Sequence, residues 1–395
     1  MSTTNHILGQ RHTIALAAAA DALTSQHSNS VHALVGFDGF VDVILRPVAT
    51  RHSMRTEDFS PITNIPAFAD RIHAAAGKSA GIELVTSESR FGGNGPLLAS
   101  GLASLGAKTT FIGCIASDSN TTQVHPLFTH FAQRCNQVVP IAQPALTHAL
   151  EFSDGKIMFN MPDPIQRVSW DTLVHTVGRD TLLKMFDSSS LIGIVNWSIM
   201  AGVESILEGL LTDILPALSQ SHKKHNRHLF IDLSDPSKRT QQDLSRVLTL
   251  LSRINTLIPT TLGLNLNEAE LANAALTATA TSHHNDSTNI ANRSILLARS
   301  IRDFLNLATV VVHPREGAAA STSQETLWID GPFTPSPALS TGAGDHFGAG
   351  FAFSQSLNLP LDACLAMAVA CSGAYVRDAA SPSATRLANF LRAGW

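Results

Sequence analysis

A glycine-flanked aspartate near the end of the chain is the strongest candidate for chemistry. Residues 340–350 read STGAGDHFGAG, between a strand-like stretch and an apolar helical pattern. Gly342, Ala343 and Gly344 predict a tight turn at a helix N-terminus, where free backbone N–H groups and the helix dipole bind phosphate oxygens. Asp345, in the first turn of that helix, can accept a proton from an alcohol. This combination indicates phosphoryl transfer, which needs positioning, charge neutralisation and a proton acceptor.

Two other interpretations of this segment stay open. Asp345 can simply cap a helix, with glycines that only allow close packing. The spacing of Gly342, Gly344 and Gly348 is G-x-G-x-x-x-G, one residue off the dinucleotide-binding fingerprint. Because that fingerprint should lie early in a βαβ unit, an NAD-binding oxidoreductase is the more distant hypothesis.

Residues 35–43, VGFDGFVDV, predict part of an acceptor site. They follow a predicted strand, and open α/β sheets bind ligands at the carboxyl ends of their strands. Asp38 and Asp42 are therefore candidates for hydrogen bonds to sugar hydroxyls. Turn chemistry is the alternative, since Asp38-Gly39 is a favourable turn dipeptide.

Residues 90–118 place paired glycines, Gly92 and Gly93, before a helical pattern that ends near Gly106. Glycines at that point let the backbone approach a ligand closely. A plain loop–helix–strand unit explains the same pattern.

Residues 263–270, GLNLNEAE, contain two Asn/Glu pairs at a spacing of three: Asn267 with Glu270, and Asn265 with Glu268. A carboxylate beside an amide can hold magnesium-bound waters next to phosphates. An ordinary helix N-terminus with acidic residues in its first turn is the alternative.

The elements that must position these residues follow an alternating pattern. Short, continuous apolar runs occur at 32–37, 109–115, 191–197, 228–233 and 308–313, with amphipathic helical segments between them. Continuous runs indicate strands covered on both faces. The alternation predicts an α/β fold with a mostly parallel sheet, in a single domain spanning 1–395.

Two regions interrupt this alternation. Residues 46–90 have little periodicity, and 147–160 carry Ser153-Asp154-Gly155 between strand-like runs, which is a hairpin signal. They predict a small β-rich lid built from approximately 38–90 and 147–160. The polar stretch 278–289 predicts a flexible loop insertion.

Composition narrows the function classes. Hydrophobic residues make up 44% of the 395 residues, and the formal net charge is −4, which favours neither nucleic acid nor an anionic membrane as partner. The start shows no signal-peptide pattern, and the apolar stretch 361–376 is too short to span a bilayer, so we expect a cytoplasmic protein. The four cysteines form no C-x-x-C pair and are expected to be free thiols.

In this order, the segments resemble the ribokinase-like sugar kinase family (carbohydrate/purine kinase family) from about residue 33 to about residue 384. GGNGPLLASGLASLGAKTTFIGCIASD is similar to the family's N-terminal signature, and STGAGDHFGAGFAF to its C-terminal signature. An N-x-x-E segment lies between them. The resemblance implies a parallel sheet flanked by helices, a β lid over the acceptor site, and the use of ATP and Mg²⁺.

The resemblance also assigns roles. It makes Asp345 the catalytic base and residues 342–344 the anion hole. Asn267 and Glu270 match the N-x-x-E motif, with Glu270 reaching the metal through water. Three more residues are assigned to the acceptor or lie near the family's acceptor-binding residues: Asp42, Gly92 and Gly93. Some relatives dimerise through the lid, so a homodimer is consistent with the resemblance.

Several departures from the family pattern concern recognition. Leu97 stands where the first signature often has Asn, so Asn94 is the candidate to replace it. The second signature begins Leu339-Ser340-Thr341 instead of Asp-Thr, which keeps Thr341 as a nucleotide-side candidate but argues against potassium activation. The missing Asp belongs to a monovalent-cation site in many relatives.

The stretch before the nucleotide loop reads VVVHPREGAAA. Gly317 is kept there, whereas His313, Pro314 and Arg315 are unusual. Arg315 is either a phosphate contact or a solvated side chain. Residues 232–239 end a strand beside the same region and could serve either substrate.

The leading hypothesis is an ATP-dependent phosphotransferase that transfers the γ-phosphate to a hydroxyl of a sugar or sugar-like substrate. A nucleoside or vitamin-type alcohol kinase is the alternative, because its catalytic turn would look the same. A catalytically silent ligand-binding relative is a third hypothesis, which the intact G-A-G-D argues against.

Overall fold

The structure is a computed structural model that describes residues 2–25, 29–117, 120–219, 227–277 and 289–395. Most of the polar stretch predicted as a flexible loop, 278–289, lies outside the described residues. Only Asn289 is described, and its side chain caps the N-terminus of helix α12 (Ile290–Leu305).

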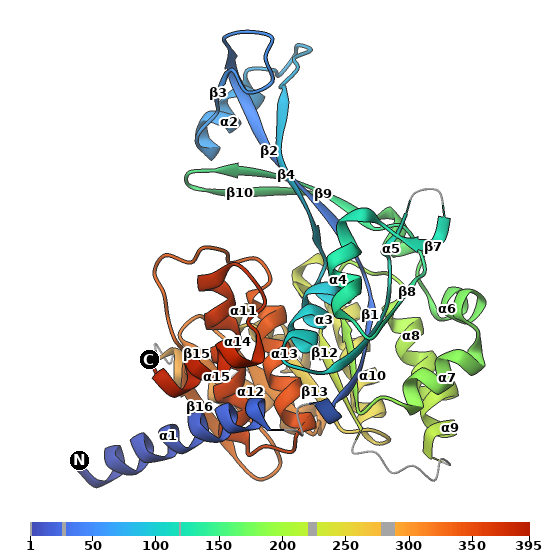
Figure 1. Ribbon diagram of the computed structural model, residues 1–395, viewed down its shortest axis with the longest axis vertical. Helices are drawn as coiled ribbons and strands as arrows, with labels where there is room; N and C mark the ends of the chain where they lie inside the picture. The colour runs from blue at the N-terminus through green and yellow to red at the C-terminus, as the bar shows by residue number, and fades with distance from the viewer. Residues whose placement is uncertain (1, 26–28, 118–119, 220–226, 278–288) are drawn as a thin grey trace.

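A nine-stranded sheet forms the body of the molecule, in the order β16-β15-β14-β13-β12-β11-β1-β5-β8 (Figure 1). Neighbours from β14 to β8 pair in parallel, whereas β15 and β16 pair antiparallel at one edge. The strands are β1 (His32–Phe37), β5 (Lys108–Gly113), β8 (Gln137–Pro140), β11 (Leu191–Val195), β12 (His228–Asp232), β13 (Thr260–Leu264), β14 (Thr309–Val312), β15 (Gly317–Ser321) and β16 (Thr326–Asp330). Each of the five predicted runs forms one of these strands, which confirms the predicted α/β fold.

Helices cover both faces of this sheet, and each face has its own apolar core. One core contains residues of α6 (Trp170–Val177), α7 (Arg179–Asp187), α8 (Val203–Gly209), α10 (Gln241–Asn255), α11 (Leu266–Thr277) and α12. The other contains residues of α1 (Ser2–Thr24), α3 (Asn94–Ser104), α4 (Thr129–Arg134), α13 (Ala343–Ser356), α14 (Leu361–Asp378) and α15 (Ala384–Ala393).

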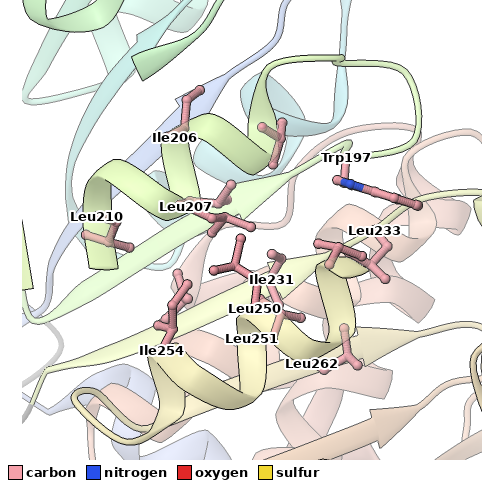
Figure 2. Packing of buried hydrophobic residues seen from close by; sticks show 14 of the residues in the cluster. Trp197, Ile206, Leu207, Leu210, Ile231, Leu233, Leu250, Leu251, Ile254 and Leu262 are labelled. Atoms are coloured by element: carbon pink, nitrogen blue, oxygen red, sulfur yellow. The ribbon is translucent and has the colours of Figure 1, made fainter. Parts of the chain in front are cut away.

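Helix α10 shows how sequence determines one of these layers. Thr240 and Asp243 form a capping box that starts the helix. Its apolar positions then recur at helical spacing, so Leu250, Leu251 and Ile254 face the sheet and α8 (Figure 2). Packing against this core fixes the strand ends that carry the functional residues.

A smaller sheet projects from the body at one end (Figure 1). Its strands are β2 (Phe40–Arg51), β3 (Phe59–Pro61), β4 (Leu84–Gly92), β9 (Ala145–Phe152) and β10 (Gly155–Met161). Strands β9 and β10 form the predicted hairpin. Helix α2 (Ile65–His73) packs on the sheet, where Phe68 joins Leu45 and Leu150 in a small core. The predicted β-rich lid is therefore confirmed.

The cysteines are free thiols, as predicted. Burial raises the pKa of Cys364 and Cys371 to about 12, so both stay protonated near neutral pH. They lie in α14, which is a buried helix of the body. Among the described residues, no helix combines the length and apolarity needed to cross a bilayer.

Candidate active site

The predicted glycine turn lies directly before helix α13. Residues 340–343 form a β-turn, called the glycine turn below, in which the Ala343 N–H donates to the Ser340 carbonyl at 3.2 Å. Gly342 has φ 90° and ψ 1°, which matches the third position of a type II turn and favours glycine. The Ala343 N–H is engaged in this turn, but no side chain caps α13, so the Gly344 N–H that follows remains available to an anion.

Asp345 occupies the first turn of α13 and is only 8% exposed. Burial, and next the charge of Asp232, raises its pKa well above the usual range. Asn94 partly opposes this shift, because its side-chain amide donates to Asp345 Oδ1 at 2.9 Å. The structure thus joins the two predicted signature segments through one hydrogen bond.

Asp38 lies beneath this junction and is fully buried. Its carboxylate accepts from the backbone N–H of Asn94 at 2.9 Å and of Gly95 at 2.7 Å, and from the Asn196 side-chain amide at 2.7 Å. Gly93, with φ 104°, lets the backbone turn into α3. The structure therefore uses Asp38 to hold the N-terminus of α3 in place.

Asp42 lies on the lid strand β2, opposite Arg90 in the β2–β4 pair. It is 9% exposed, and a Cβ at Gly92 would collide with its carboxylate. Burial raises the pKa of Asp42, an effect that the Arg90 charge opposes. The structure thus brings Asp42 and Gly92 together where the lid joins the body.

A cavity of about 500 Å³ lies on the other side of the glycine turn. The residues around it include His313, Arg315, Gly317, Phe333, Ala343 and Gly344. The Arg315 guanidinium lies 5.6 Å from the centre of the Phe333 ring. This volume is within the usual range for a pocket that holds a small organic molecule. Thr341 is exposed and does not line the cavity; its carbonyl accepts from Tyr375.

The predicted pair Asn267 and Glu270 is not brought to this site. Asn267 is exposed, and Glu270 forms an ion pair of 2.8 Å with Arg293 on α12. The other pair at the same spacing, Asn265 and Glu268, faces inward instead. A helix turns by about 100° per residue, so a shift of two positions moves a side chain to the opposite face.

Glu268 belongs to a buried acidic group at the ends of β12 and β13. It is 6% exposed and accepts from the Asn265 backbone N–H at 2.8 Å and from the Asn265 side-chain amide at 2.6 Å. Burial, and then the charge of Asp232, raises the pKa of Glu268 to about 8. Burial also raises the pKa of Asp232 to about 6.

This acidic group fits a hydrated divalent cation. Within the described residues, neither Asp232 nor Glu268 has an ion pair, so the protein supplies no positive side chain to either carboxylate when it ionises. No three His, Cys, Asp or Glu side chains in the described part of the chain gather closely enough to hold a metal ion by themselves. Mg²⁺ usually keeps several waters and binds substrate phosphates, so carboxylates that act through water suit it.

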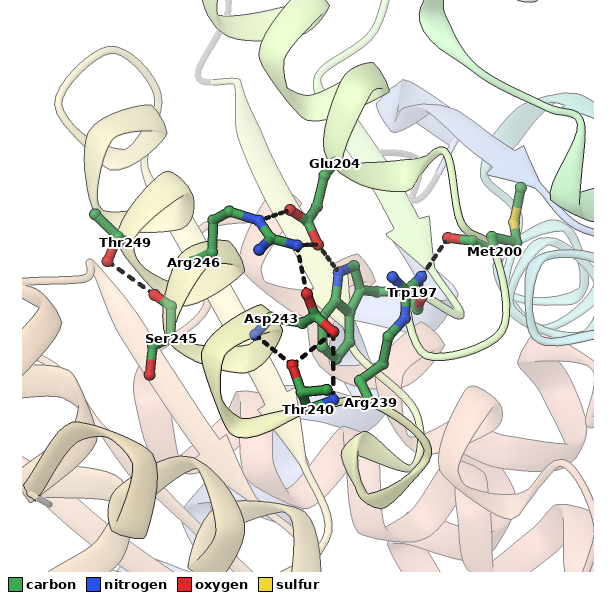
Figure 3. A network of polar contacts seen from close by, with 9 residues as sticks. All are labelled: Trp197, Met200, Glu204, Arg239, Thr240, Asp243, Ser245, Arg246 and Thr249. Carbon is green, nitrogen blue, oxygen red and sulfur yellow. Dashed lines mark hydrogen bonds and ion pairs between the residues drawn. The ribbon is translucent and has the colours of Figure 1, made fainter.

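Sequence analysis assigned no functional role to residues 196–200, which follow β11. Arg239 donates to the carbonyls of Trp197 at 2.7 Å and Met200 at 2.8 Å, and its guanidinium stacks over the Trp197 ring (Figure 3). Arg239 also donates to the Ser198 carbonyl at 3.2 Å. The segment held in this way presents Asn196, in a left-handed conformation with φ 64°, to Asp38. Long-range contacts of this kind leave no periodic signal in sequence.

Comparisons with known proteins point to one family. The model of the prokaryotic ketohexokinase family matches residues 10–393. A ketohexokinase from Haloferax volcanii is 26% identical over 359 residues, which cover 90% of each chain.

Solved structures share the fold at low identity. Ribokinase from Thermotoga maritima matches with a TM-score of 0.58 and 15% identity, covering 92% of this chain and 99% of that chain. A point mutant of phosphofructokinase-2 from Escherichia coli gives a TM-score of 0.58 and 15% identity, with 91% and 97% covered. With the family match over nearly its whole length, the chain belongs to the prokaryotic ketohexokinase family, whose members are ATP-dependent sugar kinases of ribokinase-like fold.

Proposed function

We propose that this protein transfers the γ-phosphate of ATP to a hydroxyl of a ketohexose, with Asp345 as the base. One observation carries the proposal: a buried carboxylate of raised pKa stands at the N-terminus of α13, between the cavity of about 500 Å³ and Asn94 at the start of α3. A base in this position can take the hydroxyl proton while backbone N–H groups hold the phosphoryl oxygens.

The acceptor side is proposed from the residues around the lid base. Asp42 would offer carboxylate oxygens to sugar hydroxyls. The lack of a side chain at Gly92 leaves space for that carboxylate, and Gly93 lets the chain turn into α3 next to Asp38. The Asn94 amide holds Asp345 Oδ1, which would leave Oδ2 to take the proton of the acceptor hydroxyl. Asp38 supports this arrangement from below by holding the first turn of α3.

The nucleotide side is proposed from the cavity residues. Arg315 and Gly317 line the cavity together with Ala343 and Gly344 of the anion hole. A bound Mg²⁺ would neutralise charge on the phosphates. Glu268, held by Asn265, and Asp232 would orient the waters of that ion. Thr341 would contribute through its backbone in the glycine turn.

The test is an ADP-release assay with ATP, Mg²⁺ and a panel of acceptors. We expect the highest kcat/KM with a ketohexose such as fructose, lower values with aldohexoses, and none with nucleosides. Phosphorus NMR of the product identifies the hydroxyl that receives the phosphate. A nucleoside preferred over every hexose would contradict the proposal.

The base is tested by Asp345→Asn, which is nearly isosteric but cannot take the proton. We expect the turnover number to fall by at least about 100-fold with nucleotide affinity retained. Turnover within about threefold of the wild-type value would exclude Asp345 as the base.

Assembly and location remain predictions. We also propose a homodimer through the lid, because β10 is an edge strand on which Phe159 is 50% and Met161 is 42% exposed. Sedimentation of the wild type and of a Phe159→Ser variant tests it, and a monomer at micromolar concentration would exclude it. A cytoplasmic location is proposed from the free thiols.

A further inference from the structure

We propose that Tyr375 and His346 are positioning residues that lock the two peptide groups of the glycine turn in one orientation, so that the turn presents N–H groups, not carbonyls, to the transferring phosphoryl group. The inference rests on the kinase function proposed for the same turn. Neither residue was assigned a role from the sequence motifs.

The glycine turn has a conformational alternative. A type II turn becomes a type I turn when its central peptide group, here between Thr341 and Gly342, flips by about half a rotation. Glycine at the third position tolerates both forms, so sequence at that position does not select between them. In the flipped form, a carbonyl oxygen would take the place of the Gly342 N–H. Carbonyl oxygen repels phosphate oxygen, so the flip would impair the anion hole.

Tyr375 holds this central peptide group. Its hydroxyl, from helix α14, donates to the Thr341 carbonyl at 2.9 Å. The C=O and N–H of a trans peptide point in opposite directions, so this bond directs the Gly342 N–H away from Tyr375. The hydroxyl also lies only 2.8 Å from the place that a Cβ at Gly342 would occupy. Glycine is therefore required both for the turn and for the tyrosine beneath it.

His346 holds the next peptide group. Its backbone N–H donates to the Gly342 carbonyl at 3.1 Å as a helical hydrogen bond, and its ring adds a second bond from the side. Nδ1 lies 2.8 Å from the Gly342 carbonyl, and Nε2 lies 2.8 Å from the Ser381 hydroxyl. A carbonyl only accepts, so Nδ1 carries the proton and Nε2 accepts from Ser381. Burial lowers the pKa of His346 to about 4, so the neutral ring keeps this single tautomer near neutral pH.

The two side chains act as one unit. Their rings stack with centroids 3.7 Å apart and planes 13° apart, although they come from different helices. Both residues are buried, His346 completely and Tyr375 to 5% exposure. Two consecutive carbonyls of the glycine turn are thus bound by one rigid pair of rings, and Ser381 anchors that pair from behind.

The first experiment compares Tyr375→Phe with Ser354→Ala. Tyr375→Phe keeps the stacked ring and removes only the donor to Thr341. Ser354→Ala removes a buried hydroxyl bonded to the Gly350 carbonyl at 2.8 Å, in the same helix α13 but away from the glycine turn. We expect kcat to fall about five- to tenfold in Tyr375→Phe, with KM for the sugar nearly unchanged, and to stay at the wild-type value in Ser354→Ala.

The second readout isolates the anion hole. ADP with aluminium fluoride and the sugar mimics the transferring phosphoryl group, and its affinity should fall by the same factor as kcat in Tyr375→Phe. ADP alone should bind as in the wild type. If kcat and the fluoride complex are unaffected while thermal stability falls, Tyr375 has only a packing role and the proposal is overturned.

His346 is tested by rescue. The amide N–H of His346→Asn can replace Nδ1, whereas His346→Leu offers no donor of similar size. We expect the Asn variant to retain most of kcat and the Leu variant to lose about tenfold or more. Equal kcat in the two variants, at equal nucleotide affinity, overturns the proposal. If neither variant folds, the Tyr375→Phe result decides it alone. Variant-to-wild-type ratios are taken on the best acceptor found, so failure with fructose would reject the proposed acceptor and leave this inference testable.

Discussion

The pair Glu268 and Glu270 allows a direct test of which carboxylate serves the metal. The two residues lie two positions apart on α11, but only Glu268 is buried beside Asp232. Replacing each by Gln changes charge with almost no change in shape. The sequence favoured the register with Glu270, and the structure favours Glu268, so the two variants separate the two assignments.

For activity, we expect Glu268→Gln to raise the Mg²⁺ concentration needed for half-maximal rate by about 10- to 100-fold, which is typical when a group that orients metal-bound water is lost. The sugar KM should stay close to the wild-type value. Glu270→Gln should leave both quantities unchanged, because Glu270 is occupied by a partly exposed ion pair with Arg293. Titrating Mg²⁺ at a fixed, saturating ATP concentration measures the difference.

For stability, we expect the opposite: Glu268→Gln should raise the free energy of unfolding, although it lowers activity. Burial and Asp232 raise the pKa of Glu268 from 4.5 to about 8 in the folded state. A raised pKa gives stability that is fully present below the unfolded value and lost as the pH rises through the folded value. At about 1.4 kcal/mol per pKa unit, keeping this carboxylate buried costs roughly 3 kcal/mol at pH 7.

Glutamine avoids that cost but loses one of the two hydrogen bonds from Asn265, worth about 1 kcal/mol. Without metal, Glu268→Gln should therefore be roughly 2 kcal/mol more stable than the wild type at pH 7, and no more stable at about pH 5. Urea unfolding at the two pH values measures this. Equal Mg²⁺ dependence in Glu268→Gln and the wild type, or a larger effect in Glu270→Gln, would refute the assignment.

Three further predictions concern the surroundings of the base, the β11 segment and the lid. Asp232→Asn should move the acidic limb of kcat/KM to lower pH, because removing a like charge lowers the pKa of Asp345; an unmoved limb in a pH–rate profile would contradict this. Arg239→Met should lower the free energy of unfolding by about 2–3 kcal/mol and raise the sugar KM, since three carbonyls lose their donor. Unchanged urea unfolding and KM would show that residues 196–200 keep their conformation without Arg239. Residues 46–90 and 147–160 should exchange amide hydrogens more slowly when the sugar is bound. The same exchange rates with and without sugar would show that these segments do not become more ordered on binding.

The parts of the fold that were predictable rest on local patterns. Strand β1 and the hairpin of β9 and β10 could be found because apolar runs and turn residues are adjacent in sequence. The glycine turn and Asp345 were identified because turn, helix start and carboxylate fall within six residues. A site whose residues all lie within one short segment can be found by sequence analysis.

The parts that were not predictable depend on the phase of a helix or on distant partners. Asn265 with Glu268 and Asn267 with Glu270 have the same spacing, and only the way α11 packs against the sheet decides which pair is buried. Asp38 looked like a ligand for a sugar, but its carboxylate binds backbone groups 56 and 57 residues further along the chain. No local sequence pattern predicts the burial of Glu268 or the binding of the α3 N-terminus by Asp38.

The same long-range packing gives the site a common electrostatic property. Burial raises the pKa of Asp345, and Asp232 raises it further, while Asp232 also raises the pKa of Glu268. The protein thus places three carboxylates close enough for the charge of Asp232 to disfavour ionisation of the other two, and none of the three has an ion pair within the described residues. A divalent cation bound beside Asp232 would relieve this repulsion and lower the pKa of the base. The pKa of Asp345 should therefore depend on whether a metal–nucleotide complex is bound. Asp345 would then ionise, and become able to accept a proton, mainly when the phosphoryl donor is present.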